Sequence, residues 1–95
     1  MRISLAIAAL ALVLPARADS TVAFCQLSRA DHSIPVESGP CQFSQRQGNV
    51  DVRMGKRWLF HFAANHQGQR YQRINSQQGI RFSREGHYSL TVHWR

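Results

Sequence analysis

The sequence HYSLTVHW, residues 87 to 94, alternates apolar and polar side chains along its whole length. In an extended chain successive side chains point to opposite faces, so the apolar members share one face: Tyr88, Leu90, Val92 and Trp94. A period of two is typical of a β-strand that buries one face. The stretch therefore predicts a strand with all four of these side chains, Trp94 included, in the core.

The same alternation recurs upstream, whereas helical periodicity does not. Further strands are predicted over residues 21–27, 41–43, 50–54, 58–63, 70–75 and 80–82. Polar or glycine-containing segments separate them: a loop or short edge segment at 31–35, and turns at 37–40, 45–49, 55–56, 65–69, 76–79 and 84–86. About six or seven short strands at this spacing indicate an all-β domain, folded as a small antiparallel barrel or a two-layered sandwich.

Two of these segments carry more specific expectations. In residues 58–63 both faces of the strand are partly apolar, which predicts a central strand covered on both sides. At residues 48–49 a glycine and an asparagine are both able to take positive φ.

The N-terminus has the three parts of a cleavable signal peptide. A positive start at Arg2 is followed by twelve mainly apolar residues, 3 to 14, and by the small-x-small pattern of Ala16 to Ala18. Twelve residues are too few to span a bilayer as a helix, which takes about twenty. We expect cleavage after Ala18, a single domain over residues 19–95, and a periplasmic or secreted product without a stable membrane anchor.

The predicted mature chain contains two cysteines, Cys25 and Cys41. An even cysteine count in a small exported protein predicts a disulfide, and two cysteines allow one intramolecular pairing. Cys25 lies seven positions beyond Ala18 rather than directly after it, which is not the arrangement of a lipid-modified N-terminus.

The charge balance favours an anionic partner. Without residues 1–18 the chain has ten Lys and Arg against five Asp and Glu, a net charge of +5, and nine of the ten cations are arginine. Arginine binds carboxylates and phosphates through two parallel hydrogen bonds. We expect an anionic envelope component or an acidic protein as partner, rather than nucleic acid.

Arginines also stand beside aromatic residues, at positions 57–58, 70–73, 81–82 and 94–95. Neighbours on a strand face opposite ways, so this pattern predicts aromatic side chains inside and arginines gathered on the outer face. The candidate binding residues are Arg70, Arg73, Arg81, Arg84, His87 and His93.

Two other site chemistries remain open. A small hydrolase or nuclease would use Glu85 as base, His87 or His93 as proton shuttle, and Arg81 or Arg84 to hold phosphate. A metal site would have to combine His87 or His93 with His61 or His66, because His87 and His93 are about 20 Å apart along one strand. The sequence has no glycine-rich phosphate loop, paired-cysteine zinc pattern or GxSxG motif, so we expect no enzyme activity and no cofactor.

The layout of signal peptide, single disulfide and compact β domain is similar to that of small periplasmic proteins, including periplasmic lysozyme inhibitors. Those inhibitors present a Ser-Gly loop leading to a tyrosine and meet a cationic enzyme with an acidic or neutral surface. Here Ser38-Gly39 leads into Pro40-Cys41, and the mature charge is positive. The resemblance implies inhibitor-like binding as an alternative to an exported, non-enzymatic protein with a basic binding face.

Overall fold

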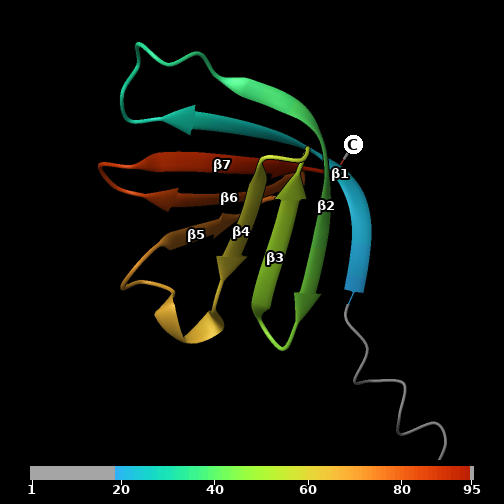
Figure 1. The fold of residues 1–95 in the computed structure, drawn as a ribbon. Helices are drawn as coiled ribbons and strands as arrows, with labels where there is room; N and C mark the ends of the chain where they lie inside the picture. Colours follow the sequence, from blue (N-terminus) through green and yellow to red (C-terminus); the bar gives the residue numbers. More distant parts are fainter. Residues whose placement is uncertain (1–18, 95) are drawn as a thin grey trace, which may run out of the picture.

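The computed structural model describes residues 19–94; the predicted signal peptide and Arg95 lie outside the described residues. Within this range the chain forms seven strands and one short 3-10 helix, Ala64–His66. The strands are β1 (Asp19–Arg29), β2 (Glu37–Arg46), β3 (Asn49–Met54), β4 (Trp58–Phe62), β5 (Gln72–Asn75), β6 (Gly79–Arg84) and β7 (Tyr88–His93). The all-β prediction is confirmed, and the architecture is one antiparallel sheet curled into a half-barrel (Figure 1).

The strand order β4-β3-β2-β1-β7-β6-β5 puts β1 at the centre of the sheet. The chain runs outward from β1 through β2 and β3 to β4, and then crosses to β5 at the opposite edge. From there it returns through β6 to β7, which pairs with the free side of β1. β1 and β2 are the longest strands, and Figure 1 shows them curving together along the sheet.

The concave face of the half-barrel holds the core. On β3 the side chains of Val50, Val52 and Met54 are buried and those between them are exposed, as the alternation predicts. No strand ladder joins β4 to β5 or β6 in residues 19–94, and aromatic rings fill the space between them instead. Phe62 of β4 stacks on Phe82 of β6 with ring centroids 4.1 Å apart, so side-chain packing connects the two ends of the open sheet.

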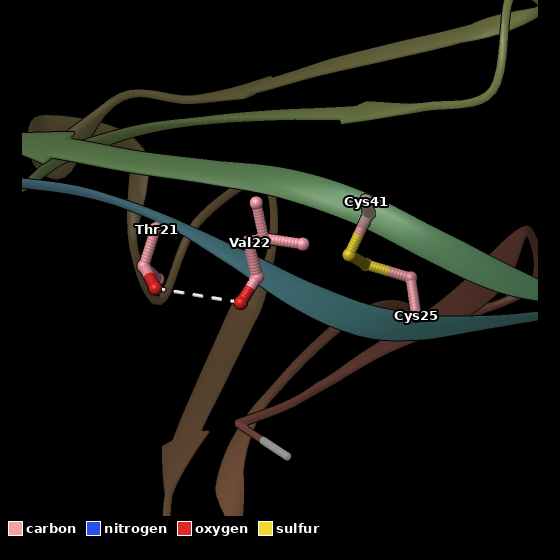
Figure 2. The surroundings of a disulfide bond; sticks show 4 residues. All are labelled: Thr21, Val22, Cys25 and Cys41. Carbon is pink, nitrogen blue, oxygen red and sulfur yellow. Dashed lines mark hydrogen bonds between the residues drawn. A yellow bond between two sulfur atoms is a disulfide. The ribbon is translucent and has the colours of Figure 1, made fainter.

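The predicted disulfide is present between Cys25 of β1 and Cys41 of β2 (Figure 2). The two residues are diagonal neighbours in the ladder, since Cys25 pairs with Gly39 and Cys41 with Ala23. Both cysteines are almost fully buried. The bridge therefore joins the two longest strands inside the core.

Three turn predictions need correction. Residues 37–40 are not a turn but the start of β2, and Pro40 fits there because the β2–β3 ladder ends at Cys41, leaving this edge of β2 open. The β3–β4 connection has three residues rather than two, because Met54 pairs with Trp58. In the β2–β3 turn the positive φ angles belong to Gln47 (54°) and Gly48 (85°), not to Asn49.

Two core predictions are also wrong. β4 is an edge strand rather than a central one, and the side chain of Leu59 on its outer face is 65% exposed. Trp94 lies just beyond β7 and is 40% exposed, although its ring packs edge-on against Phe43 at 5.3 Å. It therefore covers the end of the core rather than filling it.

Candidate anion-binding rim

Two of the predicted binding arginines line one hollow at the end of the half-barrel where β6 finishes. We call this hollow, of about 200 Å³, the rim. Its lining consists of two arginines, two histidines, two tyrosines, a phenylalanine and an alanine: Arg70, Arg84, His61, His66, Tyr71, Tyr88, Phe62 and Ala63. The rim is rich in hydrogen-bond donors.

The fold positions Arg70 and Arg84 in different ways. Arg84 is the last residue of β6, two positions after the buried Phe82 and therefore on the same, inner face of the strand. Because the strand ends there, the side chain of Arg84 is exposed. Arg70 follows the 3-10 helix, and its backbone N–H donates to the carbonyl of His66 at 2.9 Å. Next to it, the buried Tyr71 donates its hydroxyl to the carbonyl of Ala63 at 2.7 Å, which fixes this segment against the core.

The carboxylates of the described chain are largely occupied elsewhere. Glu37 forms ion pairs with Arg29 and Arg57, and Asp51 lies 2.7 Å from Nδ1 of His61. Asp31 accepts hydrogen bonds from the backbone and side chain of Ser33, which lower the pKa of its carboxyl. Within residues 20–94 no carboxylate forms an ion pair with Arg70 or Arg84.

The two rim tyrosines remain neutral donors over the physiological pH range. Burial raises the pKa of Tyr71, with the charge of Arg73 acting weakly in the opposite direction. Burial also raises the pKa of Tyr88, against the charge and hydrogen bond of Arg84. A phenol held in its protonated form can donate to an anion, and Tyr88 adds such a donor to the rim, whereas the hydroxyl of Tyr71 already donates to Ala63.

A second hollow of about 180 Å³ adjoins the rim and shares Arg84 and Tyr88 with it. It is also lined by Glu85, His87, Arg29 and His32. The hollow thus contains both a carboxylate, Glu85, and a histidine, His87, which the hydrolase hypothesis requires. However, no hydrogen bond joins Glu85 to either histidine in the described part of the chain, and both Glu85 and His87 are exposed.

The remaining candidate residues lie elsewhere. Arg81 and His93 line a hollow on the outer face of β6 and β7. Arg73 turns inward, where Nη2 donates to Gln45 Oε1 at 3.0 Å and the guanidinium lies 5.5 Å from the Phe82 ring centroid. The prediction that these arginines gather on the outer face is therefore wrong. In the alternation along their strands, Arg73 and Arg84 occupy positions on the same face as the core residue Phe82.

The histidines of the alternative metal site do not lie together. His61 and His66 line the rim, whereas His87 lies in the adjoining hollow and His93 on the outer face. Across residues 19–94, no group of three or more His, Cys, Asp or Glu side chains is arranged to hold a metal ion.

The sequence does not predict the cluster around Glu37, a residue that its turn-forming neighbours place in a turn. Oε1 of Glu37 accepts from the indole N–H of Trp58 at 3.0 Å, and Oε2 accepts from Arg29 at 3.2 Å. Arg57 and Trp58 are adjacent in sequence, and that pairing of cation and ring was the one available signal. The position of Glu37 could not be inferred, because it depends on the register between β1 and β2.

No family model matches the chain, and neither a curated protein nor a solved structure is similar enough to count as a relative.

Proposed function

We propose that the protein is an exported, non-enzymatic binding protein that recognises an anionic envelope component or an acidic protein through the rim. One observation carries this proposal: Arg70 and Arg84, far apart in sequence, line one hollow with no carboxylate partner in the described chain. An arginine that no carboxylate neutralises is available to bind a carboxylate or phosphate through two parallel hydrogen bonds.

The size of the rim indicates what kind of ligand it would take. At about 200 Å³ it is smaller than the pockets of roughly 300 to 1,000 Å³ that bury small molecules. It can accept a single carboxylate or phosphate group, with the rest of the ligand outside. This suits an anionic group on the surface of a large partner, and the net charge of +5 would assist the encounter.

Export is supported by the buried disulfide, since such bonds persist in oxidising compartments. The described residues contain no helix long and apolar enough to cross a membrane. Mass spectrometry of the exported protein should show a chain that starts at Asp19 and carries no lipid. An intact Met1 in the exported fraction, or a mass increment from acylation, would contradict the proposed processing.

The binding test compares two pairs of arginines. The Arg70→Gln/Arg84→Gln variant should lose capture of anionic components from an envelope extract, and capture by the unmodified protein should fall steeply as salt is raised. The matched control is Arg46→Gln/Arg53→Gln, which removes two exposed charges from β2 and β3 outside the rim. Equal loss in both variants, or capture that high salt leaves unchanged, would count against a specific basic site.

A small hydrolase or nuclease is the second candidate, because Glu85, His87 and Arg84 share one hollow. A phosphodiester substrate would lie against Arg84 while Glu85 or His87 moved the proton. Activity on RNA or DNA that is lost in Glu85→Gln, and retained in the exposed-carboxylate control Asp51→Asn, would favour this function. The lysozyme-inhibitor alternative has less support, since Ser38 and Gly39 lie within β2 and not in a loop.

A further inference from the structure

A larger hollow lies on the side of β5, β6 and β7 that bears Arg81. We call it the outer groove, and its lining residues are Ile74, Ser76, Gln78, Gly79, Ile80, Arg81, Thr91, Val92 and His93. Its volume is about 510 Å³, within the range of roughly 300 to 1,000 Å³ that is usual for small-molecule pockets. The rim and the hollow that adjoins it, of about 200 and 180 Å³, fall below this range.

Gly79 lines the groove with backbone alone. A Cβ atom at this position would lie 1.8 Å from the carbonyl oxygen of Val92, so no other residue fits without moving the backbone. Gly79 pairs with His93 of β7. Bare backbone therefore lies beside His93 in the groove.

The lining combines apolar surface with one permanently charged group. Ile74, at 59% exposure, is the accessible apolar side chain of the groove, whereas the side chains of Ile80 and Val92 are buried in the core on the opposite face of the sheet. Arg81 pairs with Ile74 across β5 and β6, so the two side chains project from the same face of the sheet. None of the ion pairs or side-chain hydrogen bonds in residues 19–94 involves Arg81.

Further exposed apolar side chains lie on the same face of the sheet, beyond His93. Phe24 of β1 pairs with His93, which in turn pairs with Gly79, so these three positions form one row. β6 and β1 are two strand spacings apart, about 10 Å. Phe24 is 43% exposed and Val22, two residues before it on the same face, is 66% exposed. The row leads from the bare backbone at Gly79, past His93, to the exposed ring of Phe24.

We infer that the outer groove binds a single-chain anionic amphiphile of the fatty-acid type. Its carboxylate pairs with the guanidinium of Arg81, and its alkyl chain lies against Ile74 and over Gly79 toward Phe24. An apolar surface with one cation at its margin matches a ligand with one anionic head and an apolar tail. The site is separate from the rim and does not rest on the function proposed for it.

The binding test uses dodecanoate, kept below the concentration at which it forms micelles, and follows the backbone amide signals of the ¹⁵N-labelled protein. Dodecanoate should shift the signals of Ile74, Gly79, Thr91 and His93. Acetate, which has the head without the tail, and dodecyltrimethylammonium, which has the tail with a cationic head, should shift them much less. Equal effects of all three probes, or shifts confined to Arg70 and Arg84, would overturn the inference.

Variants then separate the charged and apolar contributions. Arg81→Gln should weaken dodecanoate binding by about tenfold, the effect of losing one charge-assisted pair, and Ile74→Ser should weaken it as well. Arg53→Gln, the same change on the outer face of β3, should leave binding unchanged, as should Arg70→Gln/Arg84→Gln. If Arg53→Gln weakened binding as much as Arg81→Gln, general charge attraction would explain the result. If the protein bound anionic vesicles but not dodecanoate monomers, a membrane surface rather than a single chain would be the ligand.

Discussion

Arg29 lies over the indole ring of Trp58, with its guanidinium carbon 4.5 Å from the ring centroid, and both side chains bind the carboxylate of Glu37. Arg57 approaches the same ring and the same carboxylate, at 5.1 Å and 3.7 Å. One carboxylate thus balances two cations and satisfies the indole N–H. The cluster joins β1, β2 and β4 at one end of the half-barrel, where no strand ladder connects β4 to β1.

We predict that Glu37→Gln lowers the free energy of unfolding by about 1 to 2 kcal/mol, since the charged acceptor is lost while two partly buried donors remain. Urea unfolding monitored by tryptophan fluorescence measures this effect. The control is Glu85→Gln, an exposed carboxylate outside the cluster, which should change stability by less than about 0.5 kcal/mol. Equal effects of the two substitutions would show that the Glu37 contacts contribute nothing specific.

The two tyrosines of the chain give a pH prediction, because burial raises the pKa of both Tyr71 and Tyr88 above the ordinary value of 10.0. Their neutral forms are favoured in the folded state. Their contribution to stability is therefore fully present below pH 10 and is lost as the pH rises through the folded-state pKa values.

Absorbance titration of the native protein should give a phenol midpoint above that of the urea-unfolded chain. Since the sequence contains only these two tyrosines, the signal has no other phenolic source. The Tyr71→Phe/Tyr88→Phe variant should also lose stability less steeply above pH 10. A native midpoint at or below the unfolded one would contradict the prediction.

Phe82 and Trp94 should differ strongly in their contribution to the core. Phe82 is fully buried and stacks on Phe62, so Phe82→Ala should cost about 3 to 5 kcal/mol. Trp94 is 40% exposed, so Trp94→Ala should cost clearly less than Phe82→Ala despite removing a larger ring. Thermal or urea unfolding of the two variants gives the comparison, and a larger loss from Trp94→Ala would place Trp94 in the core after all.

The alternating pattern predicted the fold class and most inward-facing residues, because the period of two depends only on the local chain. It failed where tertiary arrangement decides the outcome. Residues 58–63 predict a central strand, but their position at the sheet edge follows from strand order, which local alternation does not contain. Residues 37–40 carry turn-forming residues, yet pairing with the long strand β1 keeps them extended.

The site was predictable in its residue types but not in its grouping. An excess of arginine indicated anionic partners, and Arg70 and Arg84 were among the candidates. Arg70 and Arg84 share a hollow, whereas Arg73 turns toward Gln45. This grouping depends on where the strands end and how the sheet curls. The outer groove could not be predicted either, because the close approach of Gly79 to the backbone of Val92 is a property of the β6–β7 pair.

The disulfide should be a major source of stability, because a domain of this size buries a limited share of its surface. Cys25 and Cys41 are 16 residues apart, and cross-linking a loop of this length restricts the unfolded chain by an amount worth about 3 kcal/mol. Replacing both cysteines with alanine should lower the free energy of unfolding by about 2 to 4 kcal/mol. Alanine is preferable to serine here, because both positions are buried and a hydroxyl would need a partner.

Chemical reduction of the unaltered protein should produce a similar loss. Both sulfurs should resist thiol reagents in the native state, and rapid, quantitative labelling without reductant would show that the bridge is not formed.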